Sequence, residues 1–229
     1  MTRSRNELEG EIIKASHKVI SERGLISFTF SEIAREAKVN ISSLRLCFFT
    51  KEDLLARILI GHFDGQYARL GYILDELKHP KEQLLAHGFS LVYPDYLRED
   101  RSGSQFLLSN PAIWTALPPF RQEQLKSSFG RLAKRVRSII DNAIENGLLI
   151  GKAKEHHQLF SSYARGSSLQ LQNPLYLAED KQQAQVVIQN NLCQLIERMP
   201  WQGTPVQIDL NRIKMIVRSA SDQSNTSLI

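Results

Sequence analysis

Residues 28–55 have the sequence FTFSEIAREAKVNISSLRLCFFTKEDLL, which carries the signals of two short helices in close succession. Thr29 is followed three residues later by Glu32, and this capping-box pattern begins a helix. The turn at Lys38 leads to Asn40, a favourable residue for beginning the next helix. Two short helices joined by a tight turn form the helix-turn-helix arrangement, whose second helix lies in the major groove of DNA. A generic helical bundle is the alternative.

Apolar residues continue at helical spacing on both sides of this stretch. The preceding set ends before Gly24, where a helix would end in a left-handed cap, and consists of Leu8, Ile12, Ala15, Val19 and Ile20. On the other side, Thr50 and Asp53 repeat the capping signal and begin a long helix that should end near Lys78. The sequence therefore predicts that a preceding helix packs the helix-turn-helix.

The rest of the chain is predicted to be mainly helical as well. Further helices are expected over residues 81–97, 122–147, 154–171 and 179–199, with an irregular segment at 110–119. The most regular apolar stripe consists of Leu125, Phe129, Leu132, Val136, Ile139 and Ala143. Beyond Trp201, the spacing is compatible with a short strand around Ile208 or with a helical turn around Ile213. The polar residues from Arg218 onward predict disorder.

The composition is that of an ordinary soluble globular protein, with 229 residues of which 42% are hydrophobic and 23% charged. No apolar stretch approaches the roughly 18–20 residues needed to cross a bilayer, so no membrane partner is expected. Cys47 and Cys193 are far apart in the sequence and predict free thiols in a reducing cytoplasm. The net charge of +5 agrees with a polyanionic partner without requiring one.

Residues that would support an enzyme or a metal site do not cluster in the sequence. His156 and His157 are adjacent, so their side chains diverge by about 100° on a helix, and no further ligands accompany them. The segment 101–104 lacks the glycine pattern of a nucleophile elbow. We therefore expect no catalytic residue, no metal and no cofactor. The remaining histidines are interpreted as surface or half-buried residues: His17, His62, His79 and His87.

The order of these features resembles the tetracycline-repressor (TetR) family of bacterial transcription regulators. The likeness rests on residues 28–48 and on the run Lys51-Glu52-Asp53-Leu54-Leu55, and it covers about residues 11–59. Beyond there it depends only on length and helical pattern. The resemblance implies an all-α fold with a helix-turn-helix DNA-binding domain over 1–52 and a helical effector-binding and dimerisation domain over 53–200. The remaining residues, 201–229, would form a partly disordered extension.

The resemblance also implies which residues meet DNA. Thr29, Ser31 and Lys51 would hold the phosphate backbone. Base edges or nearby phosphates would be met by Ile41, Ser42, Ser43 and Arg45. Each serine is equally compatible with an ordinary helix-start role. Leu46 and Phe49 point partly outward on a helical wheel, and they either remain outward or pack on a neighbouring helix.

Four positions depart from the family pattern. The family usually has glycine at Lys38, glycine or another small residue at Ser42, and tyrosine at Arg45 and Cys47. A non-glycine residue at Lys38 must adopt an uncommon backbone conformation, unless the turn differs. Arg45 can replace a tyrosine at a phosphate, and it does so with charge. The loss of tyrosine at Cys47 has no such compensation.

Two further groups of residues invite a functional interpretation. The aromatic residues that could line an effector cavity, or simply form core, are Phe63, Tyr67, Phe89, Tyr93, Phe106, Trp114 and Tyr163. The basic residues between Arg121 and Arg137 could touch DNA, an acidic effector or another protein, but a solvated outer face is the favoured interpretation. The effector itself stays unidentified at this point.

The last two predicted helices are expected to form a homodimer interface. The residues assigned to it are Leu159, Tyr163, Gly166, Ala184, Ile188, Asn191 and Leu195. A two-fold dimer would suit a helix-turn-helix protein, because two recognition helices must meet successive major grooves roughly 34–36 Å apart. The alternative is that these faces pack against 125–144 within one subunit.

The sequence therefore favours a cytoplasmic, sequence-specific DNA-binding regulator. Its partners would be a double-stranded DNA operator, a second copy of the chain and an unknown small-molecule effector that releases a repressor. Two other classes remain open at this point. They are a helical protein-interaction adaptor that has lost specific DNA binding and a small-molecule-modifying enzyme.

Overall fold

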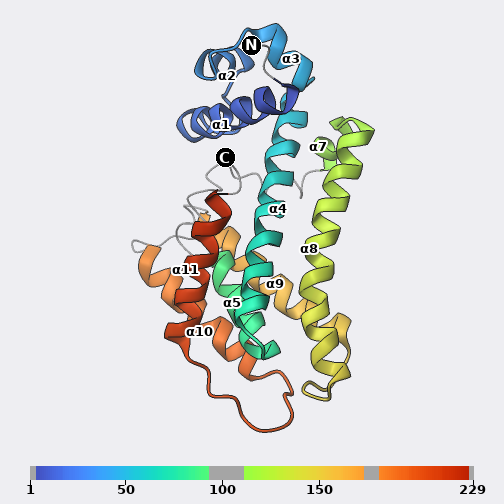
Figure 1. Ribbon diagram of the computed structural model, residues 1–229, viewed down its shortest axis with the longest axis vertical. Coiled ribbons are helices and arrows are strands. Elements are labelled where there is room, and N and C mark those ends of the chain that lie inside the picture. Colours follow the sequence, from blue (N-terminus) through green and yellow to red (C-terminus); the bar gives the residue numbers. More distant parts are fainter. Residues whose placement is uncertain (1–3, 93–110, 173–180, 227–229) are drawn as a thin grey trace. The chain divides into compact units, whose positions relative to one another are not determined.

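The computed structural model describes residues 4–92, 111–172 and 181–226, and within these ranges the fold is all-α (Figure 1). The helices are α1 (Arg5–Arg23), α2 (Phe30–Glu36), α3 (Ile41–Cys47), α4 (Lys51–Glu76), α5 (Pro80–Val92), α7 (Pro111–Ala116), α8 (Pro119–Glu145), α9 (Ala153–Gln172), α10 (Lys181–Glu197) and α11 (Leu210–Thr226). The only β pairing in these ranges is an isolated bridge between Leu149 and Trp201.

The described residues form two compact units. Unit 1 takes its residues from Met1–Phe63 and Glu99–Phe129, and unit 2 takes its residues from Asp64–Arg98 and Gly130–Leu228. The division between them falls within α4 and within α8. Each unit is treated separately below.

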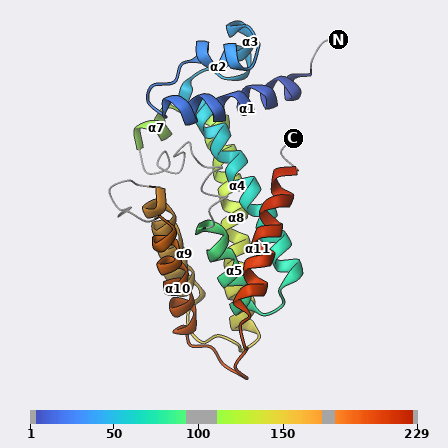
Figure 2. The same cartoon turned by 90° about the vertical axis from the view of Figure 1, so that its left-hand side faces the viewer.

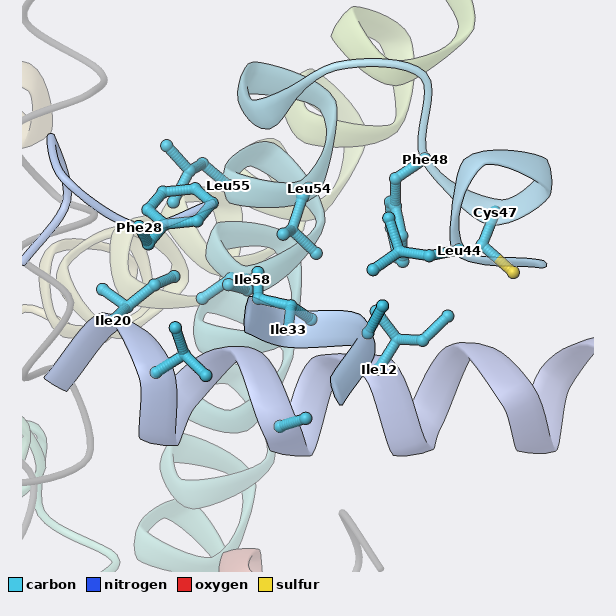
Figure 3. Close-up of a cluster of buried hydrophobic side chains, with 13 residues drawn as sticks. Ile12, Ile20, Phe28, Ile33, Leu44, Cys47, Phe48, Leu54, Leu55 and Ile58 are labelled. Carbon is cyan, nitrogen blue, oxygen red and sulfur yellow. The ribbon is translucent and has the colours of Figure 1, made fainter. Parts of the chain in front are cut away.

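Unit 1 contains the predicted helix-turn-helix, and one apolar cluster holds it together. Figure 3 shows side chains of α1, α2, α3 and the first turns of α4 pointing toward one another. The fully buried members include Ile12, Phe28, Ile33, Leu44 and Phe48. Burying a side chain of this size is worth about 1.5–3 kcal/mol, so this cluster fixes how α3 lies on α1. The prediction of a packing helix before the helix-turn-helix is confirmed.

The helix starts in unit 1 follow the caps that the sequence predicts. Thr29 and Glu32 form a complete capping box at α2. The Asn40 side chain accepts a hydrogen bond of 2.6 Å from the Ser43 N–H at the start of α3. A second capping box, between Ser4 and Glu7, begins α1, and the sequence reading missed it.

Lys38 has a φ of 54°, and it is the only non-glycine residue with positive φ among the described residues. The Val39 N–H donates to the Ala34 carbonyl at 2.9 Å, and the Lys38 N–H donates to the Arg35 carbonyl at 3.2 Å. This pair of bonds is a Schellman motif, which normally places glycine at the left-handed position. The turn of the helix-turn-helix therefore forms with lysine in the uncommon backbone conformation, which was one of the two alternatives that the sequence left open.

Unit 2 is built around α5, in which every residue except Gln83 is buried. α9, α10 and α11 all pack against this helix, and Figure 2 shows α9 and α10 side by side. Lys81 of α5 forms an ion pair of 2.7 Å with Glu197 of α10. Gln185 of α10 donates to the carbonyl of Val92 at the other end of α5, at 2.9 Å. α5 and α10 are therefore antiparallel.

His87 lies in the middle of α5 and is fully buried, so its interpretation as a surface or half-buried residue is wrong. Its ring centroid lies 6.0 Å from that of Phe160 of α9. Burial lowers the pKa of His87 to about 3, and the positive charges of Arg165 and Arg69 act in the same direction. The imidazole is therefore neutral at physiological pH.

Two sequence predictions on element boundaries need correction. Residues 111–116 form the short helix α7, although three prolines had predicted an irregular segment; Pro111 stands at the first helical position, where a missing N–H costs nothing. Of the two alternatives beyond Trp201, the helical turn around Ile213 is confirmed, because α11 begins at Leu210 and no strand forms around Ile208. The predicted disorder from Arg218 is also wrong, because α11 continues to Thr226.

The apolar stripe of α11 explains the last correction. One face of the helix buries Ile213, Val217 and Ala220, and α11 packs against α5 within unit 2. The polar residues between them face outward, so the high polarity of this segment reflects an amphipathic helix. The part of the 81–97 prediction beyond Val92 lies outside the described residues.

Candidate nucleic-acid interface

The face of α3 that points away from the core of unit 1 is the candidate interface. Leu44, Cys47 and the following Phe48 are buried, which fixes the opposite side of the helix as the outward side. The exposed residues of α3 on that side are Ile41, Ser42, Arg45 and Leu46. They form two pairs four residues apart, Ile41 with Arg45 and Ser42 with Leu46, so each pair spans one turn. A helix of this kind can lie in a major groove with these four side chains toward the bases.

The seven residues predicted to meet DNA all belong to unit 1. Thr29, Ser31, Ile41, Ser42 and Arg45 are exposed, while Ser43 and Lys51 are half-buried. Exposure makes the first five accessible to DNA. Their contacts with DNA stay predictions.

Thr29 has a structural role in addition to its predicted one. Its hydroxyl accepts from the Glu32 N–H at 3.2 Å and donates to the Glu32 carboxylate at 2.9 Å. The hydroxyl hydrogen bond is the main cause that lowers the pKa of the Glu32 carboxyl. The backbone N–H groups at the start of α2 remain the natural phosphate donors at this position.

Lys51 begins α4, and its ammonium nitrogen lies 4.7 Å from the centre of the Phe28 ring. A cation over an aromatic face is attracted by the negative face of the ring. Phe28 therefore restrains the lysine at the helix start, close to the end of α3 in the sequence.

Leu46 and Phe49 are 72% and 68% exposed, so neither packs on α1 or α4 as one sequence interpretation allowed. Phe48 and Phe49 alternate because the backbone after α3 is extended, and Phe48 takes the inward position. Arg5 was missed by the sequence reading. Its guanidinium donates to the carbonyl of Leu46 at 3.5 Å, which brings a cation to the end of α3.

Cys47 is a core residue of unit 1 and has no access to DNA. Its side chain is buried, and burial raises the pKa of its thiol. The thiol is therefore uncharged and inert at neutral pH. The tyrosine that the family usually has here is replaced by a small residue that fills the core.

An ion pair inside unit 1 holds the junction between α3 and α4. Arg121 of α8 donates from Nε to an Asp53 carboxylate oxygen at 2.6 Å, and both side chains are buried. The other Asp53 oxygen accepts from the Phe49 N–H at 3.1 Å. The guanidinium lies 6.0 Å from the Phe48 ring centre. The interpretation of the basic segment as a solvated face is therefore wrong for Arg121.

The other basic residues of this segment have exposed or partly exposed partners. Lys126 pairs with Glu123 at 2.8 Å, and Arg131 pairs with Asp64 at 2.8 Å. Arg135 lies 4.1 Å from the centre of the Tyr67 ring. These contacts agree with the solvated-face interpretation, because paired surface charges contribute little and need no further partner.

The aromatic residues predicted for an effector cavity are distributed over both units. Phe63 and Trp114 belong to unit 1, where Phe63 packs edge-on against Phe129 with ring centres 5.3 Å apart. Phe89 is buried in α5, and Tyr67 and Tyr163 are half-buried in unit 2. Tyr93 and Phe106 lie outside the described residues. The alternative interpretation as packing residues fits Phe63 and Tyr67, which contact α8.

The residues predicted for a dimer interface differ in their accessibility. Leu159 and Asn191 are exposed, whereas Tyr163, Gly166, Ala184 and Leu195 are partly buried. Ile188 is only 8% exposed within the single chain, so the subunit's own core already uses it. Two large apolar residues of α10 that the prediction omitted, Val186 and Val187, are about half exposed. The sequence placed the outward face of α10 a fraction of a turn away from its true position.

Within the described ranges, no three histidine, cysteine or acidic side chains come close enough together to hold a metal ion. His156 instead forms a 2.8 Å hydrogen bond between its Nε2 and the Ile150 carbonyl. No helix in the same ranges is long and apolar enough to cross a membrane.

Comparison with protein families identifies the helix-turn-helix. Residues 12–58 match the model of the bacterial regulatory proteins of the tetR family. Residues 12–58 therefore form a helix-turn-helix region of the TetR-family type. The matched residues cover α2 and α3, most of α1 and the first turns of α4, which is the part of unit 1 that forms its apolar cluster.

Curated relatives of this chain include proteins that are named as regulators. The HTH-type transcriptional repressor KstR2 of Mycobacterium tuberculosis is 33% identical over 79 residues, which are 34% of this chain and 40% of KstR2. The fatty acid metabolism regulator protein of Bacillus subtilis is 28% identical over 150 residues, 63% of this chain and 70% of that protein. The alignment with KstR2 thus spans less than half of either chain.

Solved structures extend the likeness to the whole TetR fold. A TetR transcription regulator from Haloarcula marismortui superposes with a TM-score of 0.68 at 16% identity, over 86% of this chain and all of that one. FadR from Bacillus subtilis, solved in complex with stearoyl-CoA, gives a TM-score of 0.59 at 18% identity. The superposition covers 81% of this chain and 96% of the FadR chain. At such low identity these matches show the fold alone.

Proposed function

We propose that this TetR-family chain is a dimeric, sequence-specific DNA-binding transcriptional repressor that a small-molecule effector releases from its operator. The observation that carries the proposal is the outward face of α3, where Ile41, Ser42, Arg45 and Leu46 are exposed together. A capped, rigidly packed helix with such a face is suited to a major groove. As a DNA-binding regulator, the protein would act in the cytoplasm. No catalytic reaction is assigned to it.

Two parts of the chain would have separate roles. Residues 1–52 would bind DNA, and residues 53–200 would bind the effector and form the dimer. The apolar residues that are about half exposed on α9 and α10, namely Leu159, Val186 and Val187, support a dimer contact through these two helices. Four helices, two from each subunit, would then form an isologous interface about a two-fold axis.

The class of effector is suggested by relatives. The Bacillus subtilis relative is named for fatty acid metabolism, and the FadR structure contains stearoyl-CoA. We propose a long-chain acyl compound as the first effector to test. An effector that binds the DNA-free form more tightly than the DNA-bound form must weaken operator binding.

Fluorescence anisotropy on the DNA upstream of the protein's own gene tests the DNA-binding proposal, with a random duplex of equal length as control. We expect a tight complex with the upstream DNA that weakens steeply as salt increases, because phosphate contacts release counterions. Arg45→Ala should weaken this complex by about 1–3 kcal/mol, the usual worth of a bidentate base contact. Equal and weak binding to both duplexes would instead favour a helical adaptor.

Effector binding is tested in the same assay by adding stearoyl-CoA, free stearate or coenzyme A to the preformed complex. Release by stearoyl-CoA at micromolar concentration supports the acyl assignment. Release by none of the three would reject that assignment and leave the operator measurement unaffected.

A further inference from the structure

The apolar side chains on the outward face of α3 show what kind of sequence this helix can read. Ser42 lies near the centre of that face, since it stands opposite the buried pair Leu44 and Cys47 on the helical wheel. Leu46 follows one turn later on the same side and is 72% exposed. Leaving so large an apolar side chain in water gives no stability to the subunit. Its exposure leaves this side chain available to a partner that covers it.

The charges around Leu46 indicate a polyanionic partner. The Arg5 guanidinium reaches the carbonyl of Leu46 itself at 3.5 Å, and the exposed Arg45 precedes Leu46 in the sequence. Lys51 lies five residues further on, at the start of α4. A guanidinium at the end of α3, beside an exposed apolar side chain, suits the major groove, where phosphates flank the bases and thymine presents an apolar 5-methyl group.

We infer that Leu46 reads a thymine methyl group, and that each half of the operator carries a thymine opposite the second turn of α3. Ser42 and Arg45, which have polar side chains, flank Leu46 on the same face. This face therefore combines polar recognition by Arg45 with apolar recognition by Leu46. The inference rests on the proposed function, because it assigns a base contact to the same recognition helix.

Replacement of thymine by deoxyuridine tests the inference, because it removes the 5-methyl group and leaves base pairing intact. The operator is first selected from a randomised duplex, and its thymines are then replaced singly and in symmetric pairs. At one position per half-site, we expect affinity to fall about fourfold, the usual value of one buried methyl group. The symmetric double replacement should lower affinity about fifteenfold if the two half-sites contribute independently.

Variants assign the effect to Leu46. With Leu46→Ala, the thymine and deoxyuridine operators should bind with equal affinity at that position. Two other exposed apolar residues provide matched controls. Phe49→Ala and Ile26→Ala, whose parent side chains are 68% and 92% exposed, should retain the fourfold difference. Circular dichroism checks that each variant is folded.

The outcomes separate this inference from the proposed function. A specific operator with no deoxyuridine effect, or an effect that Leu46→Ala leaves intact, overturns the role of Leu46 and leaves the repressor proposal standing. Loss of the effect in Phe49→Ala but not in Leu46→Ala also overturns it. If no sequence is selected at all, both the inference and the repressor proposal fail.

Discussion

At the scale of single residues, Lys38 and Gly147 can be compared directly because both occupy the left-handed position of a Schellman motif. At Gly147, the Leu148 N–H donates to the Ala143 carbonyl at 2.8 Å, as Val39 does to Ala34 after Lys38. Glycine adopts this backbone conformation without steric cost, whereas a residue with a Cβ pays roughly 1–2 kcal/mol. The helix-turn-helix therefore carries a local strain that the motif after α8 avoids.

Lys38→Gly should raise the free energy of unfolding by about 0.5–1 kcal/mol, because the relieved strain exceeds the added entropy of the unfolded chain. Thermal melting measures the gain. Lys38→Ala is the matched control, since it removes the same charge but keeps the Cβ, and it should give no gain. Equal stabilisation by both variants would contradict the strain and point to the charge.

His87 predicts how stability depends on pH. Its pKa of about 3 in the folded chain lies below its ordinary value of 6.5, so the unfolded state binds the proton more readily. The folded state therefore keeps its full stability above pH 6.5 and loses about 1.4 kcal/mol per pH unit as the pH falls toward 3. At pH 5 the loss from this residue should be about 2 kcal/mol.

Urea titrations at pH 7.5 and pH 5 measure this loss. His87→Leu replaces the titrating group with an apolar side chain of similar size. Between pH 7.5 and pH 5, the free energy of unfolding of this variant should therefore fall by about 2 kcal/mol less than that of the parent protein. His79→Leu is a control on a partly exposed histidine and should change the pH response less. An unchanged response in His87→Leu would show that other groups dominate acid unfolding.

At the scale of helices, the Asp53–Arg121 pair ties the first turn of α4 to the first turn of α8. Removing one member of a buried ion pair leaves an uncompensated charge, which typically costs about 3–5 kcal/mol. Arg121→Met should therefore destabilise the protein by about this amount. Asp53→Asn combined with Arg121→Met should recover most of the loss, because the asparagine oxygen can still accept from the Phe49 N–H.

Chemical denaturation of Arg121→Met, of Asp53→Asn and of the double variant measures the coupling between these two residues. A double variant no more stable than Arg121→Met would contradict the pair as the source of the effect. Arg131→Met removes a member of an exposed pair from the same helix and provides the control, with an expected change below about 1 kcal/mol.

The helices also show which features of the fold can be predicted from sequence. Caps and turn signals act between neighbouring residues, so Thr29, Asn40 and Gly147 indicate the correct element ends. Burial depends on contacts between distant segments, and the sequence misjudged it for His87, Arg121 and Ile188. The direction of each helical face shifts by about 100° per residue, so a small error in register moved the outward face of α10 from Val187 to Ile188.

The candidate interface was predictable to the same extent. The recognition helix and its exposed residues follow from the pattern of residues 28–55. The contact between Arg5 and Leu46 spans 41 residues, and no local signal indicates it. The exposure of Leu46 could not be decided from a helical wheel alone, because the wheel does not show whether a neighbouring helix covers that side.

At the scale of the whole molecule, the proposed dimer determines whether the chain can bind an operator tightly. Each recognition helix alone contacts one half-site, and a dimer adds the two binding energies. Leu159→Asp together with Val187→Asp should give monomers with normal helicity, because both parent side chains are about half exposed in the subunit. Their operator affinity should fall at least a hundredfold, since the second half-site no longer contributes.

Light scattering of the parent protein at micromolar concentration should give twice the 26.1 kDa of one chain. Met215→Asp changes an apolar residue of α11 that is 64% exposed, and it should leave the protein dimeric. Charge at Ile188, which the sequence alone would favour, should instead damage the core of unit 2 and unfold the subunit. A parent protein that is monomeric at this concentration would refute the dimer.

The burial of α5 on nearly all sides also limits which substitutions this protein can accept during evolution. A helix with one solvent-exposed face accepts many substitutions on that face, but in α5 every residue except Gln83 is buried. Almost any larger side chain must push α9, α10 or α11 aside, and almost any smaller one leaves a void. Inherited variation should therefore collect on the three covering helices, so new effector preferences can arise from those helices while α5 stays nearly constant.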